Sequence, residues 1–155
     1  MKLFPSKRCM VQLRDDRATT LDELRRNTKL TGTLVSLSTD KEFIGQVNDS
    51  GFKIISSEIG RGAVCIFIGE FQGSLGTLEI RIHKAFKIIF AILMISPLIG
   101  LGIAGLLDGI VTAMIPLTII GVVFARFVLV ELSFRFISKT GLNKLEKIIG
   151  LKTME

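Results

Sequence analysis

At 155 residues the chain has room for one small soluble domain, and its two cysteines, Cys9 and Cys65, form no C-x-x-C pair. We expect both cysteines to lie in the reducing cytoplasm, where a structural disulfide is not expected. The formal net charge of +6 does not indicate a nucleic-acid-binding protein, because the chain has no Trp or Tyr to stack on bases and its acidic residues are mixed among the basic ones.

The N-terminal part predicts a strand and one short helix. Cys9–Leu13 is the first strand candidate. The sequence that follows fits a capping box, with Thr20 as the N-cap and Glu23 as the third helical residue. Asp22 and Arg26 are spaced to pair along this helix, which is too short to persist unless it packs on another element.

Strand patterns dominate after this helix, so residues 1–85 as a whole predict a strand-rich cytoplasmic module. Residues 77–83 alternate apolar with charged or polar side chains, which is typical of a half-buried strand. Residues 64–68 are apolar without a break, as in a strand that is covered on both faces. Asn48–Gly51 and Gly73–Gly76 contain the residue types that hairpin loops favour.

An internal similarity links two of the predicted strands. Residues 43–47 and 67–71 share the pattern F-I-G-polar-apolar, and each precedes a glycine-containing turn and a second strand. Two similar hairpins side by side would form a four-stranded antiparallel meander; the alternative is that short strands resemble one another by chance. Gly45 and Gly69, inside these strands, indicate a bulge or a close approach of another backbone.

A long apolar stretch follows the strands. The 38 residues between Lys87 and the next basic residue contain a single charged side chain, Asp108. A bilayer core of about 30 Å needs roughly 20 apolar residues per helix. The stretch therefore predicts a transmembrane hairpin over residues 86–134, with helices of about 86–107 and 110–134.

Prolines and flanking charges bear on the topology of this hairpin. Pro97 and Pro116 lie toward the turn, so a re-entrant hairpin that returns on the same side is the alternative to two full crossings. Basic residues flank both ends and the turn has none, which by the positive-inside rule predicts cytoplasmic termini and a location in the inner (plasma) membrane. The residues expected at the membrane interface are Arg81, His83, Lys84, Lys87, Arg126 and Arg135.

Small residues recur on the predicted membrane helices at a spacing of four. Gly100 and Ala104, and Gly121 and Ala125, form small-xxx-small pairs that permit close backbone contact. We expect these residues first to pack the two helices of the hairpin together. Contact between copies of the chain in a homo-oligomer is the second expectation.

Residues 135–155 predict a cytoplasmic amphipathic helix over Ser138–Leu151, which ends at a C-terminal cap on Gly150. An antiparallel sheet with one apolar face needs a cover. We therefore expect this helix to pack on the sheet, with a position on the inner leaflet as the alternative. The expected fold class is α+β: an antiparallel β-sheet with short N-terminal and C-terminal helices, interrupted by a two-helix transmembrane hairpin.

Residues with catalytic or ligand-binding chemistry are sparse, and no catalytic residue, cofactor site or metal site is predicted. His83 is the only histidine, and we expect it at the membrane edge rather than as a ligand or base. Residues 100–105 match the dinucleotide pattern G-x-G-x-x-G, but they lie inside an apolar stretch instead of between a strand and a helix. Arg126 and Glu131 are ionisable residues near the end of the second helix, where snorkelling is the expected role and coupling the alternative.

The order of the motifs resembles that of a known group of proteins. Leu21–Leu24, Phe43–Ile54, Ile68–Phe71 and Gly76–Ile82, running into a membrane hairpin, are similar to segments of small uncharacterised bacterial two-pass membrane proteins. That resemblance implies a strand-rich cytoplasmic module but no particular activity. The order strand, helix, antiparallel strands, terminal helix also resembles helix-grip ligand-binding domains.

Binding rather than catalysis is the function that these patterns favour. The leading hypothesis is a membrane-tethered cytoplasmic interaction or regulatory module, with the lipid bilayer and another protein as partners and the sheet as the partner-facing surface. The alternatives are a toxin-immunity-type inner-membrane protein, and a protein that binds a lipid or small ligand between the sheet and the terminal helix. An enzyme is the least favoured class, because no nucleophile–base pair is visible.

Overall fold

The structure is a computed structural model that describes residues 4–35, 38–58, 64–107 and 114–154, and the fold is mixed α/β. The described strands are β1 (Ser6–Gln12), β2 (Thr28–Leu30), β3 (Phe43–Asn48), β4 (Gly51–Ser56), β5 (Cys65–Gln72), β6 (Leu75–Ile82) and β7 (Lys152–Met154). The described helices are α1 (Arg17–Arg26), α2 (Lys84–Leu107), α3 (Met114–Phe124), the π-helix η2 (Ala125–Leu132) and α4 (Ser133–Ile149).

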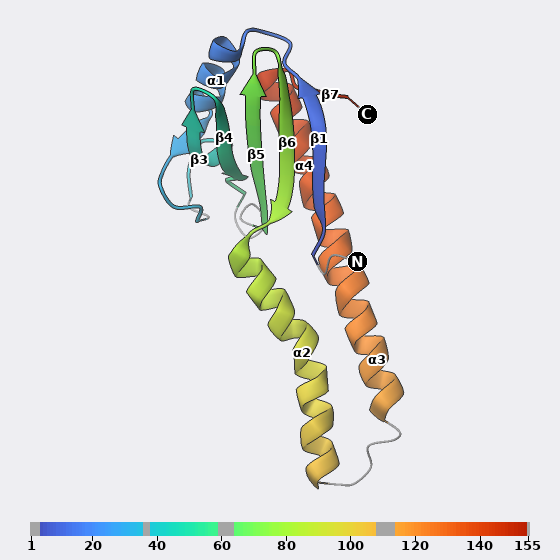
Figure 1. Ribbon diagram of the computed structural model, residues 1–155. Coiled ribbons are helices and arrows are strands. Elements are labelled where there is room, and N and C mark those ends of the chain that lie inside the picture. Colours follow the sequence, from blue (N-terminus) through green and yellow to red (C-terminus); the bar gives the residue numbers. More distant parts are fainter. Residues whose placement is uncertain (1–3, 36–37, 59–63, 108–113, 155) are drawn as a thin grey trace.

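The strands form one seven-stranded sheet in the order β2-β3-β4-β5-β6-β1-β7. Helices α1 and α4 lie behind this sheet in Figure 1, while α2 and α3 extend away from one end of it. Strands β3 to β6 form an antiparallel meander, and β1 pairs antiparallel with β6. Strand β2 pairs parallel with β3, so the prediction of an antiparallel sheet is wrong for this pair. The segment between β2 and β3 supplies the crossover that a parallel pair requires.

Both hairpin turns lie where the sequence predicted them. Strands β3 and β4 are joined across Asp49 and Ser50, and β5 and β6 across Gly73 and Ser74. Gly73 has a φ of 68°, the left-handed conformation that favours glycine in such turns. At Gly69, inside β5, a Cβ atom would lie 2.6 Å from the Phe52 ring, so this glycine makes room for an aromatic side chain of the neighbouring strand.

The main core lies between the sheet and the two helices behind it. Leu21 and Leu24 of α1, and Leu145 and Ile149 of α4, are buried in one cluster with the inward-facing residues of the sheet. Burying a side chain of this kind stabilises the fold by about 1.5–3 kcal/mol relative to leaving it exposed. Because two of these four side chains belong to α4, the C-terminal helix is an integral part of the core.

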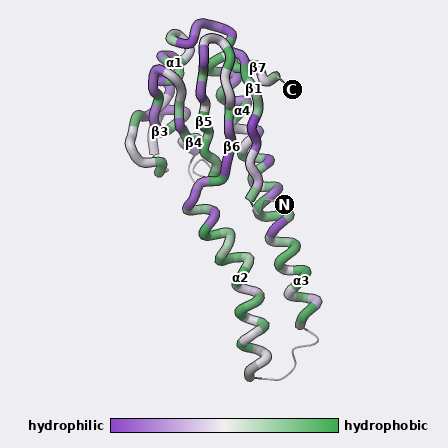
Figure 2. The backbone as a smooth tube through the Cα atoms, viewed as in Figure 1, coloured by the Kyte–Doolittle hydropathy of each residue, from purple (hydrophilic) through white to green (hydrophobic). Residues whose placement is uncertain are grey.

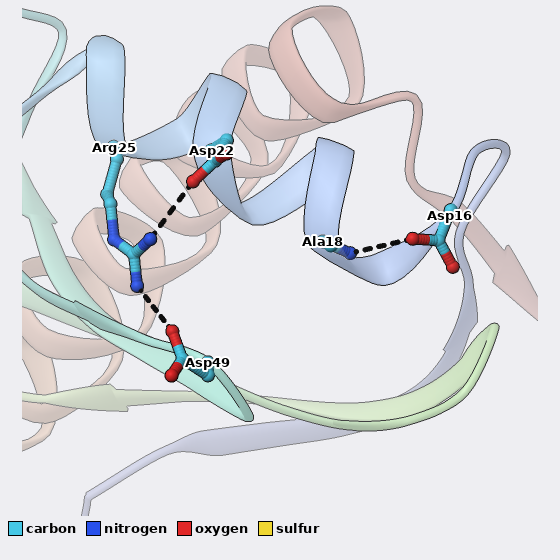
Figure 3. A network of polar contacts seen from close by, with 5 residues as sticks. All are labelled: Asp16, Ala18, Asp22, Arg25 and Asp49. Carbon is cyan, nitrogen blue, oxygen red and sulfur yellow. Dashed lines mark hydrogen bonds and ion pairs between the residues drawn. The ribbon is translucent and has the colours of Figure 1, made fainter.

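Helix α1 begins earlier than predicted. Asp16 is its N-cap, and one carboxylate oxygen of Asp16 accepts a hydrogen bond from the Ala18 N–H at 3.2 Å (Figure 3). The prediction of Thr20 as N-cap is wrong: Thr20 is buried inside the helix, and within the described chain its hydroxyl has no hydrogen-bond partner. Asp is as good an N-cap as Ser and better than Thr, so a helix that starts at Arg17 gains a turn without losing its cap.

The predicted pair between Asp22 and Arg26 is also wrong. Arg25 binds Asp22 instead, at 3.0 Å, and reaches Asp49 in the β3–β4 turn at 2.8 Å (Figure 3). The second contact raises the pKa of the Arg25 guanidinium, chiefly through its hydrogen bond to Asp49. This ion pair connects α1 to the turn of the hairpin beside it.

The second apolar helix does not end at Phe134. Helices α3, η2 and α4 follow one another without a break, and the helix ends only at Gly150, which has a φ of 59° and is the predicted C-terminal cap. Residues 133–140 contain neither Pro nor Gly, so nothing in that segment stops the helix where the amphipathic pattern begins. One helix therefore contains both the apolar segment and the segment that covers the sheet.

Candidate membrane and partner interface

Two helices of the structure are long and apolar enough to cross a membrane: one over Lys84–Ile103 and one over Ile115–Ile149. Only 6% and 17% of their most apolar windows are buried, whereas a core helix of a soluble protein is mostly buried. Side chains such as Ile92, Leu117 and Ile120 are more than 60% exposed. In Figure 2 the hydrophobic colour continues along α2 and α3, and a surface of this kind needs a partner or lipid to cover it.

Four of the six residues predicted at the membrane interface lie where β6 leads into α2. Arg81 is in β6 and His83 follows that strand, while Lys84 and Lys87 are in the first turn of α2. The Lys87 ammonium lies 5.9 Å from the centre of the Phe4 ring. The structure thus places the cations Arg81, Lys84 and Lys87 close to His83, at the end of the sheet from which α2 departs (Figure 1).

His83 connects the sheet to α2. Its backbone N–H donates to the Val64 carbonyl at 2.9 Å, and its Nδ1 accepts a hydrogen bond from the Ala85 N–H at 3.2 Å. Burial, and then the positive charge of Lys53, lower the pKa of His83. A neutral imidazole with Nδ1 as acceptor therefore caps the start of α2, which is a structural role for the only histidine of the chain.

The other two interface residues, Arg126 and Arg135, bind the same carboxylate. Glu131 lies 3.4 Å from the Arg126 guanidinium and 3.2 Å from that of Arg135. Arg126 and Glu131 are five residues apart, a spacing that the i to i+5 geometry of the π-helix η2 brings into contact. The ion pair between Arg126 and Glu131 could not be expected from the sequence, because residues five apart are not neighbours on an α-helix.

The small residues predicted to pack the hairpin occupy different environments. In the described structure, a Cβ added at Gly100 or at Gly121 would have no atom within 4 Å, so neither glycine makes a close contact between the two helices. Ala125 is buried, and the side chain of Ala104 lies outside the described residues. Packing of the hairpin at these small residues and contact between copies of the chain both remain predictions.

The face of the sheet opposite α1 and α4 is largely open and polar. One row of paired positions crosses five strands, and it consists of Gln46, Lys53, Ile68, Glu79 and Arg8. Arg8 and Glu79 form an ion pair of 3.1 Å across β1 and β6. On the next row toward α2, three isoleucines of β3, β4 and β5 form a small second core with Leu34 packed against it. We call the polar part of this surface the open face.

A groove runs between the start of β1 and α4, on the other side of the sheet. It encloses about 490 Å³, which is within the size range of binding sites for small molecules and peptides. Ile80, Phe134 and Leu142 are among its apolar lining residues, and charged side chains surround them. We call this space the β1–α4 groove.

Within the four described ranges, no three His, Cys, Asp or Glu side chains are close enough together to hold a metal ion. Burial raises the pKa of the Cys65 thiol to about 12, so this thiol is protonated at neutral pH and is a poor nucleophile. Burial also raises the pKa of Cys9.

No protein-family model, curated protein or solved structure matches this chain.

Proposed function

We propose that the chain is an integral protein of the inner (plasma) membrane that acts by binding another protein through its cytoplasmic sheet module. The observation that supports this proposal most directly is the pair of exposed apolar helices, which are attached to a sheet with a polar open face. The bilayer would cover the helices, and the module would remain in water. Binding is favoured over catalysis because the described side chains form surfaces and ion pairs rather than a nucleophile with a base.

The orientation follows from the charges that flank the hairpin. Lys84, Lys87, Arg126 and Arg135 all lie on the side of the sheet module, whereas residues 108–113 between the helices contain no Lys or Arg. Under the positive-inside rule both termini are cytoplasmic. Full crossing is the proposal, and a re-entrant hairpin is the alternative.

Cysteine labelling in intact cells tests this topology. The starting protein carries Cys9→Ser and Cys65→Ser, and single cysteines are then introduced as Thr112→Cys, between the helices, or Ser74→Cys, in the β5–β6 turn. A membrane-impermeant maleimide should label the first variant from outside and the second only after lysis. Two results would contradict the proposal: labelling of the Ser74→Cys variant from outside the cell, or release of the protein from membranes by alkaline carbonate. If the Thr112→Cys variant is labelled only after lysis, the hairpin is re-entrant.

A toxin-immunity protein that acts inside the bilayer is the second candidate. The observation that favours it is that Gly100 and Gly121 have open space around them, which leaves both positions accessible to a helix of another protein. In that case substitutions at these glycines should abolish function, while deletion of residues 1–80 should not. The reverse result would favour the cytoplasmic binding module.

A further inference from the structure

The edge of β1 is only partly paired. Strand β1 pairs with β6 along all its residues from Ser6 to Gln12, but β7 pairs only with Met10, Val11 and Gln12. Among the described residues no strand lies beside the first part of β1 on the β7 side. An unpaired edge of this kind presents backbone donors and acceptors to any extended chain that comes next to it.

The alternation of the strand identifies which atoms are presented. The Leu13 N–H donates to the Ser74 carbonyl at 2.8 Å, on the β6 side. Because antiparallel pairs alternate between hydrogen-bonded and non-hydrogen-bonded positions, Val11, Cys9 and Lys7 also direct their backbone groups toward β6. The backbone N–H and C=O groups of Arg8 and Ser6 therefore point to the open side.

The β1–α4 groove lies directly beside these groups. Pro5, Ser6 and Lys7 form its β1 side, and residues of η2 and α4 form the other side. Further along the same edge the chain already places a strand of its own, because β7 pairs there and Leu151 just before it is buried. The groove continues the position of β7 toward the end of the sheet where α2 begins.

The charges around the groove favour an acidic occupant. Lys7, Arg135 and Lys139 line it together with two carboxylates, Glu131 and Glu146. Glu131 is held between Arg126 and Arg135, which leaves Lys7 and Lys139 against the one remaining carboxylate of the lining, Glu146. Lys7 and Lys139, both exposed, face the space that an added strand would fill.

We propose that the open edge of β1 binds an extended, acidic segment of a partner protein, which adds to the sheet as a further strand in line with β7. Backbone hydrogen bonds to Ser6 and Arg8 hold the segment, and its acidic side chains face Lys7 and Lys139. This inference rests on the proposed function, since it names the chemistry of the partner that the tethered module binds. Ser6 pairs with Arg81, close to the start of α2, so the partner segment would lie near the membrane surface.

A synthetic peptide of alternating Glu and Val tests this inference on the full-length protein in lipid nanodiscs. The measurement is amide hydrogen exchange at Ser6 and Arg8. We expect exchange at Arg8 to slow about tenfold with a saturating amount of the peptide, which corresponds to one hydrogen bond of ordinary strength. A peptide of alternating Lys and Val, and the acidic peptide with N-methylated backbone, should leave exchange unchanged.

Two variants separate the backbone contact from the side-chain contact. Arg8→Pro removes the N–H on the open edge and leaves the pairing with β6, because proline is tolerated where its nitrogen faces solvent. The matched control is Arg8→Ala, which keeps that N–H and loses the same side chain and the same ion pair with Glu79. We expect Arg8→Pro to bind the acidic peptide about tenfold more weakly than Arg8→Ala does. Lys7→Glu with Lys139→Glu should reverse the preference between the two peptides.

Several outcomes would overturn the inference. The first is equal binding of the acidic and the basic peptide, and the second is equal binding of the acidic peptide by the two Arg8 variants. The third is slower amide hydrogen exchange at Ser6 and Arg8 with phosphatidylglycerol vesicles but not with the peptide, which would indicate a lipid site. Cysteine labelling at Thr112→Cys, carried out on the same protein in cells, shows independently whether the hairpin topology holds. Loss of peptide binding with that topology intact therefore refutes the acidic-strand site and leaves the proposed function standing.

Discussion

At Gly141, helix α4 packs closely against the sheet. A Cβ atom there would overlap the ring of Phe67, which is fully buried in β5. The absence of a side chain lets the helix pack directly on this ring. The amphipathic pattern around it indicated which face of the helix is buried, but only the structure shows that this position allows no side chain.

Adding one methyl group at this contact should destabilise the sheet module. We expect Gly141→Ala to lower the free energy of unfolding by about 1–3 kcal/mol, because the added carbon forces the Phe67 ring or the helix to move. The matched control is Gly102→Ala, at a helical glycine with no atom within 4 Å of its added carbon. Urea unfolding in detergent, followed by circular dichroism, measures both; equal destabilisation by the two variants would contradict the prediction.

Cys65 should be inert as long as the module is folded. Its side chain is fully buried and its pKa is about 12, so N-ethylmaleimide at pH 8 should not label it in a Cys9→Ser protein until denaturant is added. Since the folded-state pKa lies above the ordinary value of 9.0, the buried thiol favours the folded state below pH 9, and this contribution is lost as the pH rises toward 12. Labelling of the native protein at the rate of a Ser74→Cys variant would refute this.

At the scale of elements, periodicity and turn residues were enough to predict much of the sheet. The alternation at 77–83 and the two glycine-containing turns predicted β3, β4 and β6 to within one or two residues, while the apolar run at 64–68 covers only the first half of β5. Strands β2 and β7 were not predicted, because segments of three residues carry no periodic signal and form only when a longer strand lies beside them. The start of α1 was misplaced because Asp16 and Thr20 are both suitable caps, and the choice depends on tertiary contacts.

The candidate interface was predictable only in part. The clustering of cations near the start of α2 follows from the sequence, because the residues are neighbours in the chain. The contact of Arg126 with Glu131 depends on a π-helical segment that no local pattern indicates. The edge of β1 is open because β7 pairs with only part of it, and β7 comes from the other end of the chain, so no local pattern in β1 indicates this.

Lys144 connects α4 to the far side of the meander. It lies 2.9 Å from both Glu42 and Glu58, which flank β3 and β4. Burial alone would lower the pKa of Lys144, but its hydrogen bonds to Glu58 and Glu42 raise it, so the side chain remains charged at neutral pH. Both partners are well exposed, and the contribution to stability is therefore modest.

Removing this cation should loosen the attachment of α4 slightly. We expect Lys144→Met to lower the free energy of unfolding by about 0.5–1 kcal/mol in low salt, and to have no measurable effect in 1 M salt, where exposed ion pairs are screened. Lys147→Met, at an exposed lysine in the last turn of the same helix, is the control. A difference between the two variants that persists in high salt would show that packing, not charge, explains the effect.

At the scale of the whole molecule, the sequence pattern does not predict that α3, η2 and α4 form one continuous helix. The apolar and amphipathic patterns differ so much that they were assigned to two helices, with ends at Phe134 and Ser138. Backbone hydrogen bonding does not depend on side-chain polarity, so the helix continues from the apolar segment into the amphipathic segment. The apolar segment and the segment that covers the sheet are consequently parts of one continuous helix.

Insertion of a single residue tests this arrangement. One Ala inserted after Lys139 turns Leu145 and Ile149 by about 100° relative to Phe134, and should destabilise the module by several kcal/mol as their burial is lost. The same insertion after Leu117, in α3, leaves the phase of α4 unchanged and should leave urea unfolding of the module unchanged. If the two insertions were equivalent, the packing of α4 would not depend on its phase.

In the proposed membrane topology, the continuous helix formed by α3, η2 and α4 has a mechanical consequence. A membrane that becomes thinner or thicker changes the tilt of the helices that cross it. Helix α3 continues through η2 into α4, and α4 is packed into the core of the sheet module. A change in the tilt of α3 is therefore either absorbed by a bend in η2 or causes the sheet module to rotate relative to the membrane. The thickness and tension of the bilayer would then act on the same edge of β1 that faces α4.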